Sequence, residues 1–415
     1  MKRNPFIHFF MLTASLLLLV SSCSKENDDQ LPTEPVPIDL TSEQVALVGS
    51  ENAFAFDIFS RIAENPGRNN LIISPLSISV ALSMTLNGAD GETRDAMLDA
   101  LRVSGLSPEI INKSYKDLTE ALLSVDKRIL ISIANSVWTE DDFAVKKTFI
   151  DILTKYYSAE AGSFDINDPN AHVKINQWIK EKTNNLITDM LEKLEDNDVM
   201  LLVNAIYFKG KWKSQFDEAN TVLMPFYKYD GTSVTVPMMK QRRKFKSYSG
   251  QDFTLAEFPY GQGNYVMDVI LPDPSVSMNE FTARLTESEF KAWISQMNER
   301  EIDLSFPRFK YGFKKKLKEV LSDMGMAVAF TESADFSNIS EEYDLLINEV
   351  THQAFIETNE EGTEAAAATV VEVGLTSVGE QPLVLKLDHP FIYLIRETST
   401  NSILFMGIVA DPSAN

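Results

Sequence analysis

The chain of 415 residues is 44% hydrophobic and 10% aromatic, which is enough apolar material to bury the core of a large domain. Its net charge of −22 and its pI near 4.6 argue against a nucleic-acid partner, because neutralising a phosphate backbone requires a concentrated basic face. With a single cysteine, the chain cannot form an internal disulfide. Neither a repeat nor a low-complexity linker divides residues 42–415, so we expect one large mixed domain there.

Residues 1–22 have the composition of a targeting segment. Lys2 and Arg3 precede an apolar run over residues 6–20, and small residues lead to the only cysteine, Cys23. The sequence Leu-Val-Ser-Ser-Cys at residues 19–23 resembles the bacterial lipobox, in which the cysteine is lipidated and becomes the first residue after cleavage. This resemblance predicts a lipoprotein signal peptide and a mature chain that is lipid-anchored to the bacterial outer membrane, periplasmic or surface-exposed. An ordinary signal peptide with an incidental cysteine is the alternative.

Residues 23–41 are polar, acidic and rich in proline. Acidic residues lie close behind the cysteine, and Pro32, Pro35 and Pro37 follow them. Such a composition cannot bury enough apolar surface to fold by itself, so it predicts a flexible tether. The acidic residues also resemble the export signals that carry some bacterial lipoproteins to the outer cell surface, although any short acidic linker has this composition.

Helical patterns dominate the first half of the body. Apolar residues recur at helical spacing over residues 45–62, and Pro75 opens another helix after a short apolar strand at residues 70–73. Ser74 and Ser77 lie within this apolar stretch. Because buried hydroxyls need hydrogen-bond partners, we expect another polar group to meet them. Further helices are predicted at residues 93–101, 108–124, 149–156 and 168–191.

Strand patterns become more frequent toward the end of the chain. Asn204 is a polar residue inside a hydrophobic strand predicted at residues 199–208, and Trp212 ends a turn predicted at residues 208–212. The other predicted elements are strands at 129–138, 391–396 and 403–409, a strand starting at 345, short strands between 222 and 271 with turns at 229–231 and 260–263, and helices at 287–297 and 315–324. This order of elements favours an α+β domain.

The stretch from His352 to residue 374 carries two conflicting local signals. Thr-Glu-Ala-Ala-Ala-Ala at residues 363–368 is typical of a helix start, with Thr363 as the cap. In a strand, the odd-numbered residues from 363 to 373 would share one small or apolar face, and Glu364 and Glu372 would lie on the other. That second pattern suits insertion between two existing strands. The residues alone leave both interpretations open.

Motifs for catalysis are missing from the sequence. It contains no His-Glu-x-x-His, no Cys/His cluster and no Gly-x-Ser-x-Gly. Ser124 and Lys127 match a Ser-x-x-Lys pair only formally, since they lie in a polar connection. The basic run at residues 242–244 is more typical of a solvated hairpin than of an anion site, and His389 suits a packed position in the core or at a sheet edge. We therefore expect no enzymatic activity, no metal and no cofactor.

Five separated stretches together resemble the serpins, the family of serine protease inhibitors. The segment Leu-Lys-Leu-Asp-His-Pro-Phe-Ile-Tyr-Leu-Ile at residues 385–395 fits the C-terminal signature of that family, and Phe-Met-Gly at residues 405–407 fits its ending. The other stretches are residues 70–98, 202–216, 236–240 and 349–368. The resemblance covers nearly the whole body, and it implies a serpin fold with a large central β-sheet, smaller sheets, about eight to nine surrounding helices and an exposed reactive-centre loop.

The resemblance also implies roles for individual residues. In serpins the central sheet opens to admit the reactive loop as a new strand. By motif match, a polar cluster called the shutter lies beneath the opening sheet, Trp212 marks the breach where insertion starts, and the reactive loop spans about residues 360–382. The shutter residues are Ser74, Ser77, Asn204 and His352. The hinge residues that insert first are Glu360, Gly362, Thr363, Glu364, Ala365, Ala366, Ala367 and Ala368.

The family's usual spacing places the scissile bond between Thr376 and Ser377, within a bracket from Leu375 to Val378. The resemblance then implies a monomeric suicide substrate that traps a serine protease, or else a cysteine protease, as a covalent acyl-enzyme. Small Thr376 and Val378 suit an elastase-like pocket, whereas Leu375 suits a chymotrypsin-like one. The alternative is a non-inhibitory surface lipoprotein that uses the same fold as a scaffold for binding.

Overall fold

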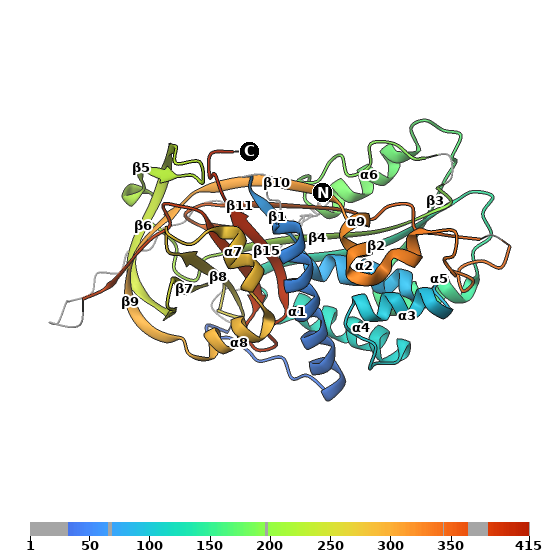
Figure 1. The fold of residues 1–415 in the computed structure, drawn as a ribbon, viewed down its shortest axis with the longest axis horizontal. Helices are drawn as coiled ribbons and strands as arrows, with labels where there is room; N and C mark the ends of the chain where they lie inside the picture. The colour runs from blue at the N-terminus through green and yellow to red at the C-terminus, as the bar shows by residue number, and fades with distance from the viewer. Residues whose placement is uncertain (1–31, 65–68, 196–197, 343, 364–380, 415) are drawn as a thin grey trace, which may run out of the picture. The chain divides into compact units, whose positions relative to one another are not determined.

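The computed structural model describes residues 32–64, 69–195, 198–342, 344–363 and 381–414. Its contacts divide the chain into Met1–Pro32 and Thr33–Asn415, and the description below concerns the second unit. Figure 1 shows helices packed against mixed β-sheets in this unit, so the predicted α+β class is confirmed.

Two helices near the start of the domain show how local sequence sets element boundaries. Helix α1 (Ser42–Ala63) begins with a capping box, in which Thr41 and Gln44 bond each other's backbone. Helix α2 (Pro75–Leu86) begins with Ser74 as its cap and proline in its first turn. The other helices are α3 (Gly91–Ala100), α4 (Pro108–Ser124), α5 (Lys147–Tyr157), α6 (Ala171–Lys182), α7 (Met278–Arg284), α8 (Glu287–Ser295) and α9 (Lys318–Leu321).

The six-stranded sheet has the order β10-β11-β12-β4-β2-β3. Strands β2 (Ile129–Glu140) and β4 (Met200–Lys211) form a long antiparallel ladder, and β10 (Phe309–Lys316) pairs with β11 (Thr351–Thr358). The other two members are β3 (Glu160–Phe164) and the two-residue strand β12 (Gly362–Thr363). We call this six-stranded sheet the central sheet.

The second sheet has nine strands, in the order β1-β15-β14-β8-β7-β6-β9-β13, with β5 paired beside β6. Two of its inner strands, β14 (Phe391–Glu397) and β15 (Ile403–Val409), are buried at every position. The others are β1 (Leu71–Ile73), β5 (Val222–Tyr227), β6 (Ser233–Ser249), β7 (Phe253–Pro259), β8 (Tyr265–Pro272), β9 (Asn298–Pro307) and β13 (Leu383–Lys386). Helix α2 contacts both β4 and β15, so it bridges the two sheets inside the core.

Three details of the sequence-based prediction are wrong. The turn predicted at residues 208–212 is strand as far as Lys211, because this segment has pairing partners on both sides, in β2 and β12. The helix predicted over residues 168–191 ends at Lys182, and Asn184 and Asn185 adopt left-handed backbone conformations that a helix cannot contain. The strand expected from residue 345 starts only at Thr351. Helix α7 and strands β9 and β10 were not predicted.

Residues 33–40, which form the second half of the predicted tether, lie against the domain. The buried Asn264 accepts a hydrogen bond from the Val36 backbone N–H (2.9 Å) and donates one to the Val36 carbonyl (2.7 Å). The Ile38 N–H donates to Ser399 Oγ at 2.9 Å. This part of the segment is therefore hydrogen-bonded to the body rather than a free tether.

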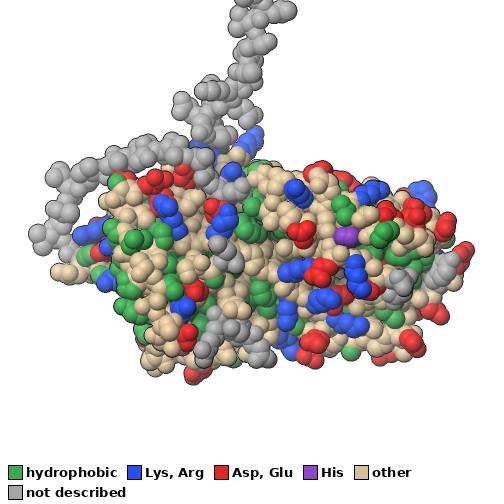
Figure 2. All heavy atoms as spheres, turned by 90° about the horizontal axis from the view of Figure 1, so that it is seen from above, with side chains coloured by type: hydrophobic (Ala, Val, Ile, Leu, Met, Phe, Trp, Pro, Cys, Tyr) green, Lys and Arg blue, Asp and Glu red, His purple; other side chains and the backbone are tan. Residues whose placement is uncertain are grey.

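Charges of both signs are interspersed on the surface. On the face that Figure 2 shows, Lys and Arg side chains lie among Asp and Glu side chains. In the predicted basic run, Arg242 pairs with Glu301 across strands β6 and β9 at 2.9 Å, which agrees with the solvated interpretation of that run. Within the described residues, no helix is both long and apolar enough to cross a membrane.

Candidate functional site

The first residues of the expected reactive loop lie inside the central sheet. Gly362 and Thr363 form β12, which pairs antiparallel with Lys211 and Gly210 of β4 on one side and with Thr358 of β11 on the other. Among the described strands, β4 and β11 share no ladder of their own, and β12 alone links them. The two strands therefore border a slot that a single strand fits. This start of the loop, expected to be exposed, is buried from Glu360 to Thr363.

Position 362 requires glycine, because the chain here packs directly against the backbone of β4. Its φ is +150°, and a Cβ placed on it would lie 2.1 Å from the backbone oxygen of Gly210. No side chain can occupy that space, since the neighbour is backbone and not a flexible side chain. The glycine therefore lets the chain enter the sheet directly beside β4.

Aromatic side chains hold the chain at the entry point. The Trp212 ring stacks on Tyr260 at 4.3 Å between centroids and 11° between planes, and the Tyr260 hydroxyl lies 2.8 Å from Thr363 Oγ1. Trp212 also donates from Nε1 to the Asn359 carbonyl (2.9 Å) and from its backbone N–H to the Glu361 carbonyl (2.7 Å). The structure thus brings Trp212 and the hinge together, as their assignment to one region requires.

Glu360 is the charged member of this region. Its side chain is only 3% exposed, and its Oε1 accepts hydrogen bonds from Arg308 Nε at 2.7 Å and from Thr221 Oγ1. A buried carboxylate needs such a cation, because desolvation without a partner is costly. Sequence reasoning missed both Arg308 and Tyr260. Burial of Glu360 would have signalled that a cation was needed, but nothing in the sequence indicates which one. We call Trp212, Tyr260, Arg308, Glu360 and Thr363 the hinge contacts.

The four predicted shutter residues lie together near the start of α2. The Ser74 N–H donates to His352 Nε2 at 3.0 Å, and Ser74 Oγ donates to the Leu404 carbonyl at 2.7 Å. Ser77 Oγ donates to Asn204 Oδ1. The hydroxyls of both serines are therefore buried with partners, as predicted. We call Ser74, Ser77, Asn204 and His352 the centre cluster.

Asn135 extends the centre cluster to a neighbouring strand, and no sequence motif pointed to it. Asn204 Nδ2 donates to Asn135 Oδ1 at 2.6 Å, and Asn135 Nδ2 donates to the carbonyl of Tyr157 at 2.7 Å. Because Asn135 lies opposite Asn204 in the β2–β4 ladder, the polar chain crosses the sheet at one level. It links α2, β4, β2 and the end of α5.

His352 is neutral in this arrangement. Its Nε2 accepts the Ser74 N–H, which an imidazolium cannot do, and burial lowers the pKa of His352 to about 4. Protonation would therefore break the bond that joins β11 to the start of α2. The cluster joins neighbouring strands through hydrogen bonds and is not an acid–base site.

A cavity of about 330 Å³ adjoins the centre cluster. It is bordered by residues 200–204 of β4, by residues 345–352 at and before the start of β11, and by one side of α2. Ser77, Asn204 and His352 line it. The cavity is thus lined by residues of both strands that border the slot.

Several predicted site residues lie outside the described residues. They are Cys23, the hinge residues Glu364, Ala365, Ala366, Ala367 and Ala368, and the reactive-bond residues Leu375, Thr376, Ser377 and Val378. Their assignments remain predictions. In the described part of the chain, no group of three or more His, Cys, Asp or Glu side chains is placed to hold a metal ion.

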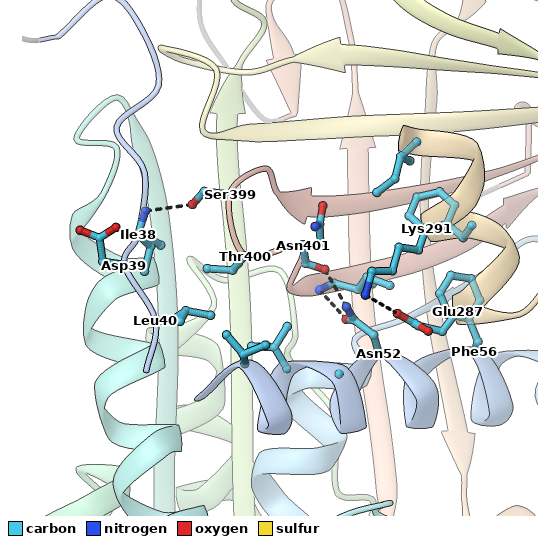
Figure 3. Close-up of a pocket in the computed structure, with 16 residues that line it drawn as sticks. Ile38, Asp39, Leu40, Asn52, Phe56, Glu287, Lys291, Ser399, Thr400 and Asn401 are labelled. Carbon is cyan, nitrogen blue, oxygen red and sulfur yellow. Dashed lines mark hydrogen bonds and ion pairs between the residues drawn. The ribbon is translucent and has the colours of Figure 1, made fainter. Parts of the chain in front are cut away.

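A second cavity, of about 350 Å³, lies between α1 and α8 (Figure 3). Asn52 of α1 donates to the Asn401 carbonyl at 2.9 Å and accepts the Ile403 N–H at 3.3 Å. Lys291 and Glu287 of α8 lie opposite, 4.0 Å apart. Ile38 and Leu40, from the docked N-terminal segment, close one side of this cavity.

Comparisons with known proteins agree with the sequence resemblance. The family model described as serpin (serine protease inhibitor) matches residues 49–412. The leukocyte elastase inhibitor of Xenopus laevis is 33% identical over 371 residues, which cover 86% of this chain and 97% of that protein. The crystal structure of the thermophilic serpin tengpin in its native state has a TM-score of 0.82 at 31% identity, covering 92% of this chain and 98% of tengpin. Human thyroxine-binding globulin in complex with thyroxine gives 0.83 at 28% identity, covering 90% and 100%.

Proposed function

The chain belongs to the serpin family, and from that premise we propose that it is a suicide-substrate inhibitor of serine proteases. Serpins are protease inhibitors rather than catalytic enzymes, and the elastase inhibitor of Xenopus is a relative with that activity in its name. The observation that carries the proposal is the position of β12. Two hinge residues already pair with both strands at one end of the slot, and the same two strands line the cavity beside the centre cluster.

The mechanism begins as ordinary proteolysis. The serine Oγ of the protease attacks the carbonyl carbon of Thr376, and the Thr376–Ser377 peptide bond breaks. The nitrogen of Ser377 leaves with a proton from the protease histidine, and an ester joins the protease to Thr376. The released strand then extends β12 into the slot and carries the attached protease with it before water can hydrolyse the ester.

Hydrogen bonding supplies the driving force for this insertion. Each new ladder bond contributes about 0.5–1.5 kcal/mol net, so roughly a dozen inserted residues with partners on both sides yield ~10 kcal/mol or more. Residues 365–368 are alanines, which fit a space bounded by a core, and residues 364–373 contain no proline that would remove a donor. Before cleavage this energy is stored kinetically.

We also propose an elastase-like target, with a chymotrypsin-like protease as the second choice. The bracket from residue 375 to residue 378 contains Leu, Thr, Ser and Val and no Lys or Arg. A trypsin-like pocket, which requires a basic residue, has nothing to bind there.

Incubation with elastase-like and chymotrypsin-like proteases tests the proposal. We expect a complex that survives SDS, together with a released C-terminal peptide whose first residue identifies the scissile bond. The cleaved protein should also melt at a higher temperature than the intact one, because insertion completes the sheet. Cleavage with no complex and no gain in thermal stability would contradict the inhibitor proposal.

For localisation, we propose that Cys23 carries a lipid that anchors the mature chain to the bacterial outer membrane. The lipobox-like sequence at residues 19–23 supports this. Labelling of expressing bacteria with an alkyne fatty acid should tag the wild type and not the Cys23→Ser variant. Equal labelling of both would contradict the proposal.

The cavity between α1 and α8 favours a second candidate function, the binding of a small amphiphilic molecule. Phe56, Phe290 and Ile294 offer an apolar wall, while Asn52 and Lys291 offer polar groups. The structural similarity to thyroxine-binding globulin shows that this fold accommodates such a role in another protein. A thermal-shift screen with aromatic and isoprenoid carboxylates tests it, and the absence of any shift would contradict it.

A further inference from the structure

The chain passes from β11 to β12 through a tight turn. Asn359 and Gly362 exchange two backbone hydrogen bonds: the Asn359 N–H donates to the Gly362 carbonyl at 2.9 Å, and the Gly362 N–H donates to the Asn359 carbonyl at 3.2 Å. Thr358 and Thr363 form the next pair. The hinge therefore enters the central sheet as one arm of a β-hairpin with a two-residue loop, and β11 is the other arm.

The side chain of Asn359 closes this turn. Its Oδ1 accepts the N–H of Glu361 at 3.0 Å and the N–H of Gly362 at 3.3 Å. Asparagine suits this position, because its short side chain can bond backbone groups two residues further on. The Asn359 carbonyl also accepts the indole N–H of Trp212 at 2.9 Å. Asn359 thus holds the turn through its side chain and anchors it through its backbone.

The turn sets which residues meet across the sheet. In a hairpin the register follows from the turn, so each step forward from Thr363 is one step back from Thr358 along β11. Position 367 of an inserted strand then lies opposite Ala354. The ladder with β4 gives the same level, since Thr363 pairs with Gly210 and position 367 falls opposite residue 206.

This register decides which side chains enter the core. The even-numbered residues of β11 are buried and the odd-numbered ones are partly exposed. Because directly opposed residues point to the same side of a sheet, the pairing of Thr358 with Thr363 directs the odd-numbered positions of an inserted strand to the core. From 363 to 373 these are Thr, Ala and Val. A shift by one residue would bury Glu364 and Glu372 instead, and unpaired buried carboxylates oppose insertion.

We infer that Asn359 is a positioning residue for the proposed inhibition: its side chain holds the turn that sets the register in which the cut loop inserts between β4 and β11. The inference rests on the proposed function, because only an inserting strand uses this register. Asn359 acts through the N–H groups of Glu361 and Gly362 and not on the bond that is cut. Without its Oδ1 the turn can change length, and strands that start out of register stall while water hydrolyses the acyl-enzyme.

Three substitutions separate this role from a general loss of stability. Asn359→Ala removes the amide oxygen, whereas Asn359→Asp keeps an acceptor oxygen at the same place. Asp230→Ala is the matched control. In the hairpin of β5 and β6, Asp230 Oδ1 accepts the Thr232 N–H at 2.9 Å, so this substitution removes the same kind of bond from a turn outside the slot. The number of inhibitor molecules consumed per protease inactivated is the first measurement.

Disulfide trapping is the second measurement, and it reports the register directly. Since Asn359 and Gly362 are a hydrogen-bonded pair, alternation along the hairpin makes position 367 and Ala354 a non-hydrogen-bonded pair, with Cα atoms ~4.5 Å apart and within disulfide range. Ala354→Cys with Ala367→Cys is therefore the in-register pair.

Two offset pairs carry Ala366→Cys or Ala368→Cys in place of Ala367→Cys. All pairs are made in a Cys23→Ser background, which removes the only cysteine of the chain. Each protein is cleaved with an elastase-like or chymotrypsin-like protease and then oxidised with copper–phenanthroline, and the cross-linked fraction is read from a denaturing gel.

With the wild-type turn we expect the in-register pair to cross-link after cleavage and the offset pairs to do so about tenfold less. Asn359→Ala should raise the number of inhibitor molecules consumed about 5- to 15-fold, as for the loss of one or two hydrogen bonds, and should move cross-linking from the in-register pair to an offset pair. Asn359→Asp and Asp230→Ala should stay within about twofold of the wild type in both measurements.

Three results would overturn the inference. If Asn359→Ala leaves the ratio of in-register to offset cross-links unchanged, Asn359 does not set the register, even where inhibition falls. If Asn359→Asp behaves like Asn359→Ala, the acceptor oxygen is not the group that acts. If Asp230→Ala loses inhibition to the same extent, the effect follows from any weakened turn.

Failure of the proposed function gives a different result. If the cleaved chain with the wild-type turn forms the in-register cross-link but no SDS-resistant complex, the inhibitor proposal falls and the inference stands. If the complex forms without the in-register cross-link, the inference falls and the inhibitor proposal stands. If neither protease cleaves between residues 364 and 380, both are contradicted.

Discussion

The same two strands, β4 and β11, border the slot at the hinge contacts and at the centre cluster, and the two regions are built in opposite ways. At the hinge contacts, packed side chains and backbone fill the slot. Gly362 lies against backbone, the rings of Trp212 and Tyr260 stack, and Glu360 is paired with Arg308. At the centre cluster the described residues show no ladder between the two strands, and a cavity of about 330 Å³ adjoins Ser77, Asn204 and His352.

This difference shows where an inserted strand can add stabilising hydrogen bonds. The hinge contacts already have the hydrogen bonds and the packing of a completed sheet. Near the centre cluster, no strand in the described part of the chain joins β4 to β11, and each ladder bond that an inserted strand forms there is worth about 0.5–1.5 kcal/mol. A structure that is complete at one end and open farther along is suited to insertion that starts at the hinge.

The largest expected effect comes from blocking the hinge end. Thr363→Arg places a long charged side chain where the wild-type residue is 4% exposed and contacts the Tyr260 hydroxyl. We expect inhibition to fall by at least ~100-fold and the protein to become a plain substrate, because a buried unpaired charge opposes insertion. Titration of the protease gives the stoichiometry of inhibition. Thr363→Ser, which keeps the hydroxyl, is the control, and full inhibition by the Arg variant would contradict the insertion mechanism.

Removal of Arg308 should destabilise the hinge contacts without placing a larger side chain in the slot. Arg308→Ala leaves Glu360 buried without its cation, and we expect a loss of about 3 kcal/mol, at the lower end for broken buried pairs because the Arg308 side chain is 41% exposed. Urea unfolding followed by fluorescence measures this loss. Arg242→Ala removes an arginine whose partner Glu301 is at the surface, and it should leave the midpoint nearly unchanged. Equal midpoints for the two variants would show that the Glu360 pair adds little.

Acid should weaken the centre cluster. Burial lowers the pKa of His352 to about 4 from an ordinary 6.5, so the folded protein favours the neutral ring. Stability from this group is complete above pH 6.5 and is lost as the pH falls toward 4, at up to roughly 1.4 kcal/mol per unit, or about 2 kcal/mol at pH 5.

Unfolding free energies at pH 7 and pH 5 test this, and His352→Gln should abolish the part due to His352. The contribution of His389 to stability depends on pH in the opposite direction. Burial alone would lower its pKa, but Asp388 and the Pro272 carbonyl raise it, so its contribution is present at low pH and is lost as the pH rises through the raised value. A pH dependence that His352→Gln leaves intact would show that other groups cause it.

The smallest expected effect tests the hydroxyl pair at the hinge. Tyr260→Phe keeps the ring stacked on Trp212 but removes the hydrogen bond to Thr363, at a cost of about 1 kcal/mol. We expect faster spontaneous loss of inhibitory activity on storage at elevated temperature. Thr363→Val in the same background should add little if the two hydroxyls act only on each other, and a fully additive double variant would refute that pairing.

Most of the local structure was predictable from the sequence. Helix α4 was predicted at residues 108–124 as observed, and Pro75 and Ser74 marked the start of α2, because caps and apolar periodicity act within a few residues. The positions of Ser74, Ser77, Asn204 and His352 followed from their motifs, although the sequence alone supplied only the need for buried partners.

The identity of those partners required the tertiary structure. Arg308 lies 52 positions from Glu360 and Asn135 lies 69 positions from Asn204, and neither pairing has a local signal. The segment at residues 208–212 was predicted as a turn, whereas pairing with β2 and β12 makes it a strand as far as Lys211.

The sequence by itself determined the α+β class, the family, the composition of the hinge and the absence of a catalytic motif. Only the tertiary structure decided that Gly362 and Thr363 already lie within the central sheet, where among the described strands they alone link β4 and β11. The physical reason is that local sequence sets backbone preference over a few residues, whereas the pairing of a two-residue strand depends on neighbours more than 140 positions away.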